Sequence, residues 1–326
     1  MNRISIVLCT YNGERFLAEQ LDSLLRQTHP ADEIIIQDDG SDDRTMQIAT
    51  HYAHVCPAIQ LYTNPYERGV NNNFFSAIRR ATGEYIAICD QDDIWEPSKL
   101  ERQLKTIGEH LLCASRSQPF STTGAAIWED TRTPNYDLLR LLFVSGISGH
   151  TMLLSRKLLD KMPSLETIID LRYYDVILAM VAASYHSIVY IDEPLVHHRR
   201  HTEAASFYKP HDYKMTLQNI VRNFWRTWRL YRELHPIMRT RLEGHLQFLR
   251  QIDSQEQTLA DAIHLLELMT DTSWWSIFRQ QWFCMQHCDK LFYAPLKKSL
   301  LTRLRGAYFP ISCSEYFRYL SKKQCL

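Results

Sequence analysis

The chain has 326 residues, of which 45% are hydrophobic and 23% charged, and its formal net charge at pH 7 is zero. These values describe an ordinary soluble globular protein of about two or three lobes, and they exclude a disordered chain and a partner attracted by net charge alone. The eight cysteines form no CxxC pair, so we expect reduced thiols in a cytosolic protein. We expect neither a signal peptide nor a membrane-spanning helix, because polar side chains break the longest uncharged stretch, residues 176–191.

Short apolar runs alternate with helical patterns through the first third of the chain. Strands are predicted over residues 3–9, 33–36, 59–62 and 85–89, and each is followed by a helix with one apolar face. Ser41 or Asp42 is expected to cap the second of these helices. The alternation predicts an α/β fold in which a mostly parallel sheet is flanked by helices.

Three of these strands end in polar residues, which are 10–12, 38–39 and 90–93. Open α/β sheets bind ligands at the carboxyl ends of their strands. The acids Asp90, Asp92 and Asp93 repel one another unless a cation lies among them, and Mg²⁺ or Mn²⁺ suits such oxygen ligands. The alternative for an isolated acidic triplet is a surface turn. Because the glycine-rich phosphate motifs of dehydrogenases and P-loop enzymes are absent, a diphosphate would bind through the metal.

Four segments in order resemble the inverting, GT-A-fold glycosyltransferases of family 2. They are residues 5–12, 37–45, 83–86 and 89–95, and the last is similar to a variant of rhamnosyltransferase-like members. The resemblance implies a Rossmann-like GT-A fold. We expect a nucleotide-sugar-binding half over residues 1–110, an acceptor-binding and catalytic half over 111–211, and a helical C-terminal extension over 212–326.

The resemblance also implies roles for individual residues. The residues expected at the nucleotide are Thr10, Tyr11, Asn12, Asp39, Asn73 and Asp90. Asp90 and Asp92 match the DxD pair that binds the metal, which neutralises the charge of the departing nucleoside diphosphate. The alternatives are helix capping for Asp38 and Asp42, helix initiation for Asn73, and shaping of the turn for Asp93.

Residues 171–175 resemble the family motif that carries the general base. Asp175 matches the base, although Tyr174 replaces the usual histidine and residues 176–177 replace tryptophans. An inverting transfer needs such a base to take the proton of the acceptor hydroxyl. Asp175 could instead be a helix N-cap. His150 precedes a strand predicted over residues 151–154, and it could be a site residue or a structural histidine.

The segment 196–201 follows a predicted strand and resembles the family's ending of basic residues and histidine. His201 matches a histidine that contacts the metal or the diphosphate, and Arg199 and Arg200 could face phosphate oxygens. A basic loop without a ligand is the alternative. His197 and His198 point in opposite directions on a strand, which disfavours a zinc site.

The C-terminal third lies beyond the resemblance. Seven arginines from Arg222 to Arg250 are interleaved with aromatic residues. Such helices suit an anionic membrane surface or could pack on the catalytic domain with solvated basic faces. RNA binding is a third interpretation, but no nucleic-acid module supports it. The processive-synthase motif Q-x-x-R-W is absent, so transfer of a single sugar is expected.

Together these patterns predict a metal-dependent, inverting glycosyltransferase with Mg²⁺ or Mn²⁺ as its cofactor. Its donor would be a UDP- or dTDP-linked sugar, and we expect its acceptor to be a lipid-linked saccharide or another saccharide in the synthesis of a cell-surface polysaccharide. We expect a cytoplasmic location with peripheral attachment to the inner face of the membrane, and no nucleic-acid partner. The alternatives are a sugar nucleotidyltransferase, whose glycine-rich, lysine-bearing loop is missing, and a catalytically silent sugar-nucleotide-binding scaffold.

Overall fold

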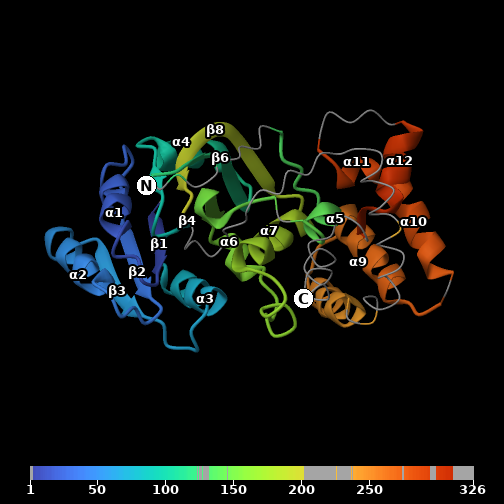
Figure 1. Cartoon of the computed structure of the whole chain (residues 1–326), viewed down its shortest axis with the longest axis horizontal. Helices are drawn as coiled ribbons and strands as arrows, with labels where there is room; N and C mark the ends of the chain where they lie inside the picture. Colours follow the sequence, from blue (N-terminus) through green and yellow to red (C-terminus); the bar gives the residue numbers. More distant parts are fainter. Residues whose placement is uncertain are drawn as a thin grey trace.

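One mixed sheet of eight strands runs through the molecule (Figure 1) in the order β3-β2-β1-β4-β7-β6-β8-β5. The computed structural model describes residues 3–122, 124, 127, 132–144, 146–201, 225, 236, 238–273, 275–293 and 299–310. The strands are β1 (Ile4–Thr10), β2 (Glu33–Asp38), β3 (Ile59–Thr63), β4 (Tyr85–Cys89), β5 (Ile94–Trp95), β6 (Leu112–Phe120), β7 (Met152–Ser155) and β8 (Ile188–Arg199).

The first half of the sheet is parallel, and the second half is mixed. β1 pairs in parallel with β2 and β4, and β2 with β3. β7 runs antiparallel to β4 and β6, β8 is parallel to β6, and β5 is antiparallel to β8. The predicted α/β fold with a mostly parallel sheet is therefore confirmed.

Helices cover both faces of this sheet. They are α1 (Leu17–Leu25), α2 (Thr45–Val55), α3 (Val70–Arg80), α4 (Lys99–Ile107), α5 (Leu138–Leu141), the 3₁₀ helix η1 (Gly149–Thr151), α6 (Lys157–Asp160), α7 (Tyr174–Ser184), α9 (Gln257–Thr270), α10 (Ser276–Gln286), α11 (Cys288–Leu291) and α12 (Leu300–Ala307). Residues 238–249 are also helical. None of the helices in the described part of the chain is long and apolar enough to span a membrane.

Strand periodicity divides the core into two layers. Successive side chains of a strand point to opposite faces, so Ile6 of β1 packs with Leu21 of α1, whereas Val7 packs with Ile78 of α3. α7 is buried almost all round, because α3, α5, α6, α9 and β8 all contact it. Residues of α9, α10 and α11 belong to the same core cluster as Val7 and Ile78, and Figure 1 shows the C-terminal helices at the far end of the molecule from α2 and β3.

The start of α2 differs from the prediction. The helix begins at Thr45 with Arg44 at the N-cap position, so neither Ser41 nor Asp42 caps it. Asp43 serves this end instead, because its carboxylate accepts a hydrogen bond of 2.8 Å from the backbone N–H of Thr45. The longer turn leaves Ser41 and Asp42 free to bond with the loop after β1.

Candidate active site

The carboxyl ends of β1, β2 and β4 meet at one edge of the sheet. Thr10 and Asp38 are partners in the register of β1 and β2, and Leu8 and Cys89 in that of β1 and β4. The loops that follow these strands therefore lie side by side, as expected for parallel strands. The end of β8, the turn η1 and the start of α7 bring further polar residues to the same region.

Hydrogen bonds lock the loops after β1 and β2 together. Thr10 donates from its hydroxyl to Asp38 over 2.9 Å, and Asn12 Oδ1 accepts from the backbone N–H of Asp42 over 3.0 Å. The N–H of Asn12 donates in turn to the hydroxyl of Ser41. Asp38 does not cap a helix, because it closes the turn after its own strand by accepting from the N–H groups of residues 40 and 41. These bonds give Thr10 and Asn12 a clear role in shaping the loops.

Tyr11 and Asp39 lie in the loops that follow β1 and β2 at the carboxyl edge of the sheet. The Tyr11 side chain is 49% exposed, with the Arg68 guanidinium 5.7 Å from the centre of its ring. Two hydrogen bonds of 2.9 Å between the Gln91 amide and the Tyr11 backbone hold this loop against the acidic loop. The Asp39 carboxylate accepts from Asn64 Nδ2 (2.6 Å) and from the N–H of Gly69 (2.8 Å). A carboxylate has about four lone-pair sites, so Asp39 can still accept from a ribose hydroxyl.

Asn73 does not reach this surface. It is buried in α3, where its amide donates to the backbone oxygen of Gln37 (3.2 Å) and accepts from the side chain of Gln37 (3.1 Å). Both amide groups therefore join α3 to β2. We assign Asn73 to this packing contact, which corrects its expected place at the nucleotide.

Asp92 and His201, which the sequence predicts as metal ligands, contact one another. His201 Nε2 lies 2.7 Å from Asp92 Oδ2, and both residues are largely buried. Burial and the neighbouring Asp93 and Asp90 raise the pKa of Asp92. A cation would relieve this cost. Carboxylate and imidazole ligands fit Mn²⁺, and His201 Nδ1 has no hydrogen-bond partner within the described residues.

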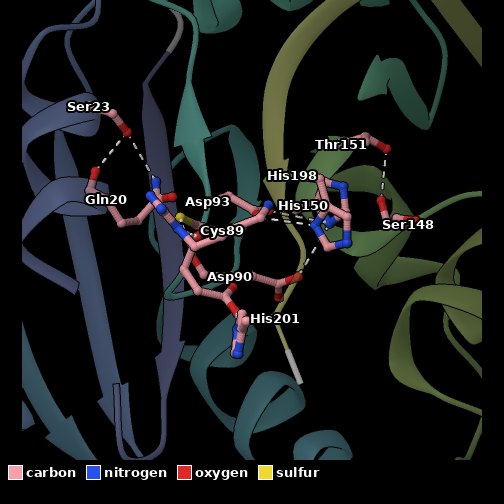
Figure 2. Close-up of polar contacts among 12 residues, drawn as sticks. Gln20, Ser23, Cys89, Asp90, Asp93, Ser148, His150, Thr151, His198 and His201 are labelled. Atoms are coloured by element: carbon pink, nitrogen blue, oxygen red, sulfur yellow. Dashed lines mark hydrogen bonds and ion pairs between the residues drawn. The ribbon is translucent and has the colours of Figure 1, made fainter. Parts of the chain in front are cut away.

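Asp90, which is predicted to bind the metal together with Asp92 and His201, contacts His150 instead of these two residues. Its Oδ2 lies 3.3 Å from His150 Nδ1, and Figure 2 shows the Asp90 side chain pointing toward that ring. His150, which the sequence left undecided, is thus a neighbour of the acidic loop. The pairing was hidden from sequence analysis because His150 reaches Asp90 through the antiparallel contact of β7 with β4.

Asp93 is a structural anchor. Its side chain is fully buried, and its Oδ1 accepts 3.0 Å bonds from His198 Nδ1 and the backbone N–H of Arg199. Within the described residues, Asp93, His150 and His198 are the three His, Cys, Asp or Glu residues whose ligand atoms lie within 4.8 Å of one another. The His150 and His198 rings, however, are stacked 4.6 Å apart and only 10° from parallel. Because an imidazole binds a metal in its own plane, this stacking favours a hydrogen-bonded cluster over a shared ion.

Asp175 lies in the first turn of α7. The helix begins at Tyr174 after the N-cap residue Tyr173, so the N-cap alternative for Asp175 is wrong. Its carboxylate accepts from the N–H of Val176 (2.8 Å) and from that of Gly149. Burial is the main cause that raises the pKa of Asp175 to about 6, with the charge of Asp90 adding to it. Such a carboxylate is mostly ionised at neutral pH, and its pKa is close to the pH at which a general base works well.

Tyr174, which replaces the histidine of the family motif, is a packing residue. Its ring stacks on Phe74 of α3 with 3.8 Å between the ring centres, and its backbone N–H donates to Asn71 Oδ1 over 2.7 Å. These two contacts fix the first turn of α7 against α3. The departure from the motif therefore leaves Asp175 on a rigid support.

Arg199 does not face a phosphate. Its buried guanidinium lies 4.6 Å from the ring centres of both Phe16 and Phe120, and it donates to the backbone oxygen of Asp92 (2.9 Å) and to Glu19 (2.5 Å). It therefore supports the acidic loop from behind, which corrects its expected role. Arg200 donates from its backbone to Phe120 (2.8 Å), is partly exposed, and stays a candidate for phosphate contact.

The two preceding histidines point in opposite directions, as predicted. His197 Nε2 contacts Glu96 Oε1 over 2.5 Å, whereas His198 contacts Asp93 on the other side of β8. His197 is thus separate from the acidic loop.

The mixed α/β sheet flanked by helices, with Tyr11, Asp39 and the Asp92–His201 pair at its carboxyl edge, has the architecture of a nucleotide-sugar-binding fold of the GT-A type. Residues 5–162, just under half of the chain, match the model of glycosyl transferase family 2, so this part of the chain is similar to that family. The rhamnosyltransferase-like subtype stays a prediction.

Two relatives illustrate the similarity. Putative glycosyltransferase EpsE of Bacillus subtilis is 37% identical over 109 residues, which are 33% of this chain and 39% of that protein. UDP-Glc:alpha-D-GlcNAc-diphosphoundecaprenol beta-1,3-glucosyltransferase WfgD of Escherichia coli is 35% identical over 101 residues, which are 31% of this chain and 39% of that protein. The chain thus spans well under two thirds of the length of these curated relatives.

Solved structures share the fold over almost the whole chain. The S. aureus TarS 1–349 complex with UDP-GlcNAc has a TM-score of 0.54 at 15% identity, and covers 99% of this chain and 91% of that one. The mannosyltransferase PcManGT from Pyrobaculum calidifontis, in complex with GDP-Man and Mn²⁺, has a TM-score of 0.50 at 17% identity, and covers 99% of this chain and 84% of that one. At these identities the likeness shows the GT-A fold.

Proposed function

We propose that the protein is a metal-dependent, inverting glycosyltransferase that moves one sugar from a nucleoside diphosphate to a saccharide acceptor. One observation carries the proposal: Asp39, the Asp92–His201 pair and Asp175 gather at a single edge of the sheet from four separate elements. Asp39 suits ribose binding, the Asp92–His201 pair suits metal binding, and Asp175 suits proton transfer.

The donor would lie with its nucleoside against Tyr11 and Asp39 and its diphosphate toward Asp92. Asp92 and His201, with Asp90 beside them, would hold Mn²⁺ or Mg²⁺, which supplies neutralisation of the charge that develops on the leaving diphosphate. Uridine or thymidine diphosphate sugars are the donors we favour, and the relative WfgD carries UDP-Glc in its name. The complex of PcManGT with Mn²⁺ supports the choice of metal.

Asp175 would act as the general base. It takes the proton of the acceptor hydroxyl while the hydroxyl oxygen forms a bond to the anomeric carbon. The bond from that carbon to the donor phosphate oxygen breaks, and its electron pair leaves with the nucleoside diphosphate. A single displacement of this kind inverts the configuration at the anomeric carbon.

Donor binding is tested by thermal shift of the full chain with UDP, dTDP and GDP and their sugars, with and without Mn²⁺. We expect a UDP or dTDP ligand with Mn²⁺ to raise the melting temperature by several degrees, because a ligand at about 100 times its Kd stabilises a protein by about 2.7 kcal/mol. The shift should shrink when EDTA removes the metal. Absence of a shift with every nucleotide would refute the proposed function.

We further propose that the acceptor is lipid-linked and that the protein attaches to an anionic membrane surface. Trp282 of α10 is 63% exposed and Leu301 of α12 is 77% exposed, and these two helices pack side by side. The exposed Arg279 and Arg303 lie on the same helices. Exposed aromatic and basic residues suit the interface of an anionic bilayer. Four arginines of the predicted basic stretch lie outside the described residues, namely Arg222, Arg226, Arg229 and Arg232.

Membrane attachment is measured by co-sedimentation with vesicles that contain anionic lipid. We expect binding at low ionic strength that falls as salt rises, because charge attraction is screened. Trp282→Ala should reduce the bound fraction several-fold, whereas Gln286→Ala on the same helix should not. Equal binding of the wild type and Trp282→Ala would remove α10 as the attachment surface.

A further inference from the structure

The short turn η1 connects the two chemical halves of the site. The backbone N–H of Gly149 donates to the Asp175 carboxylate, and the side chain of the next residue, His150, reaches Asp90. Two consecutive residues thus touch the carboxylate that would take a proton and one of the carboxylates that would face the donor diphosphate. In Figure 2 the His150 ring lies between η1 and the acidic loop.

Gly149 allows this close approach because it lacks a side chain. A Cβ atom at this position would lie 2.0 Å from Tyr174 Oη. Any other residue must therefore displace η1 or the Tyr174 ring, and Asp175 follows Tyr174 in the same turn of α7. The close contact keeps η1 in register with the start of α7.

His150 is held on several sides. It is 3% exposed, its ring stacks on that of His198, and its Nδ1 lies 3.3 Å from Asp90 Oδ2 and 3.6 Å from Asp93 Oδ2. Asp93 is itself tied to β8 through His198 and Arg199. The imidazole therefore packs against His198 of β8, and its Nδ1 faces Asp90, which is more exposed than Asp93.

We propose that His150 is a positioning residue that orients the Asp90 carboxylate toward the donor metal and sets its separation from Asp175. The inference rests on the proposed function of this site and adds to it a residue outside the DxD pair and the base motif. Groups that orient metal-site carboxylates typically account for about 10- to 100-fold in metal affinity or activity. A displacement of about 1 Å between reacting groups costs a similar factor.

Three substitutions separate this role from a merely structural one. His150→Asn keeps an N–H donor near the place of Nδ1, His150→Gln moves the donor toward the place of Nε2, and His150→Ala removes it. His197→Asn is the matched control, because His197 lies on the opposite side of β8 and contacts Glu96. The readouts are the Kd of Mn²⁺ in the presence of UDP, the Kd of UDP without metal, and the melting temperature.

We expect His150→Gln and His150→Ala to weaken Mn²⁺ binding about 10- to 100-fold, with metal-free UDP affinity within about twofold of the wild type. His150→Asn should recover most of the loss, and His197→Asn should match the wild type. If His150→Ala fails to fold, the Asn and Gln pair decides, since both are polar and of similar size. Equal Mn²⁺ affinity of the Asn and Gln variants overturns the positioning role. Failure of the proposed function is a different result, in which the wild type itself binds neither UDP nor Mn²⁺.

Discussion

Asp175→Asn is expected to lower kcat by about 10²- to 10⁴-fold, the range that a general base contributes. The affinity for the nucleotide donor should stay within about twofold of the wild type, because Asp175 belongs to α7, whereas Tyr11 and Asp39 belong to the loops after β1 and β2. The measurement is initial-rate kinetics beside nucleotide binding. Asp170→Asn is the matched control, since this exposed aspartate belongs to the loop just before α7. Wild-type activity in Asp175→Asn would remove it as the base.

The pH profile provides a second check on the same residue. A base must be deprotonated to act, and the pKa of Asp175 is raised to about 6, chiefly by burial. The rate should therefore be constant above about pH 7 and should fall as pH drops through 6, approaching a tenfold loss per unit. A profile without an acid limb between pH 5 and 7 would contradict this assignment.

Asp92→Asn is expected to weaken Mn²⁺ binding by on the order of 100-fold or more, because it removes the charged ligand that lies beside His201. This loss should exceed the loss caused by removing a group that only orients a ligand. Donor binding in the presence of Mn²⁺ should fall to its metal-free level. Transfer should be lost with it, since the leaving diphosphate would no longer be neutralised.

The metal-free protein distinguishes this effect from misfolding. Burial and the charges of Asp93 and Asp90 raise the pKa of Asp92, so its ionised form destabilises the empty site at neutral pH. Asp92→Asn should then melt no lower than the wild type when both are in EDTA. Asp42→Asn, an exposed aspartate of the neighbouring loop, is the control and should keep wild-type Mn²⁺ affinity. Unchanged Mn²⁺ binding by Asp92→Asn would refute the assigned ligand.

Local patterns in the sequence predicted the strands and the polar loops that follow them. The apolar runs of β1, β2 and β4 were visible in the sequence, and parallel pairing then brings their ends to one edge. Tyr11, Asp39 and Asp92 could therefore be placed together without a structure. Asp175 and His201 came from the family resemblance, and the structure brings both to the same region.

Roles that depend on tertiary contacts could not be inferred in the same way. A basic residue beside a candidate diphosphate site suggests a phosphate ligand, but Arg199 is buried between Phe16 and Phe120. Asn73 suggests a site residue, but its amide bonds to Gln37 on β2. The sequence left His150 open between a site residue and a structural histidine, because its contact with Asp90 depends on the pairing of β7 with β4.

The most direct test of the proposed site is a crystal structure of the full chain with UDP and Mn²⁺, with data collected at the manganese absorption edge. We expect an anomalous peak within coordinating distance of the Asp92 carboxylate and the His201 imidazole, and the nucleoside in contact with Tyr11 and Asp39. A manganese ion held by Asp93, His150 and His198, or a nucleotide bound away from this edge of the sheet, would contradict the proposed site.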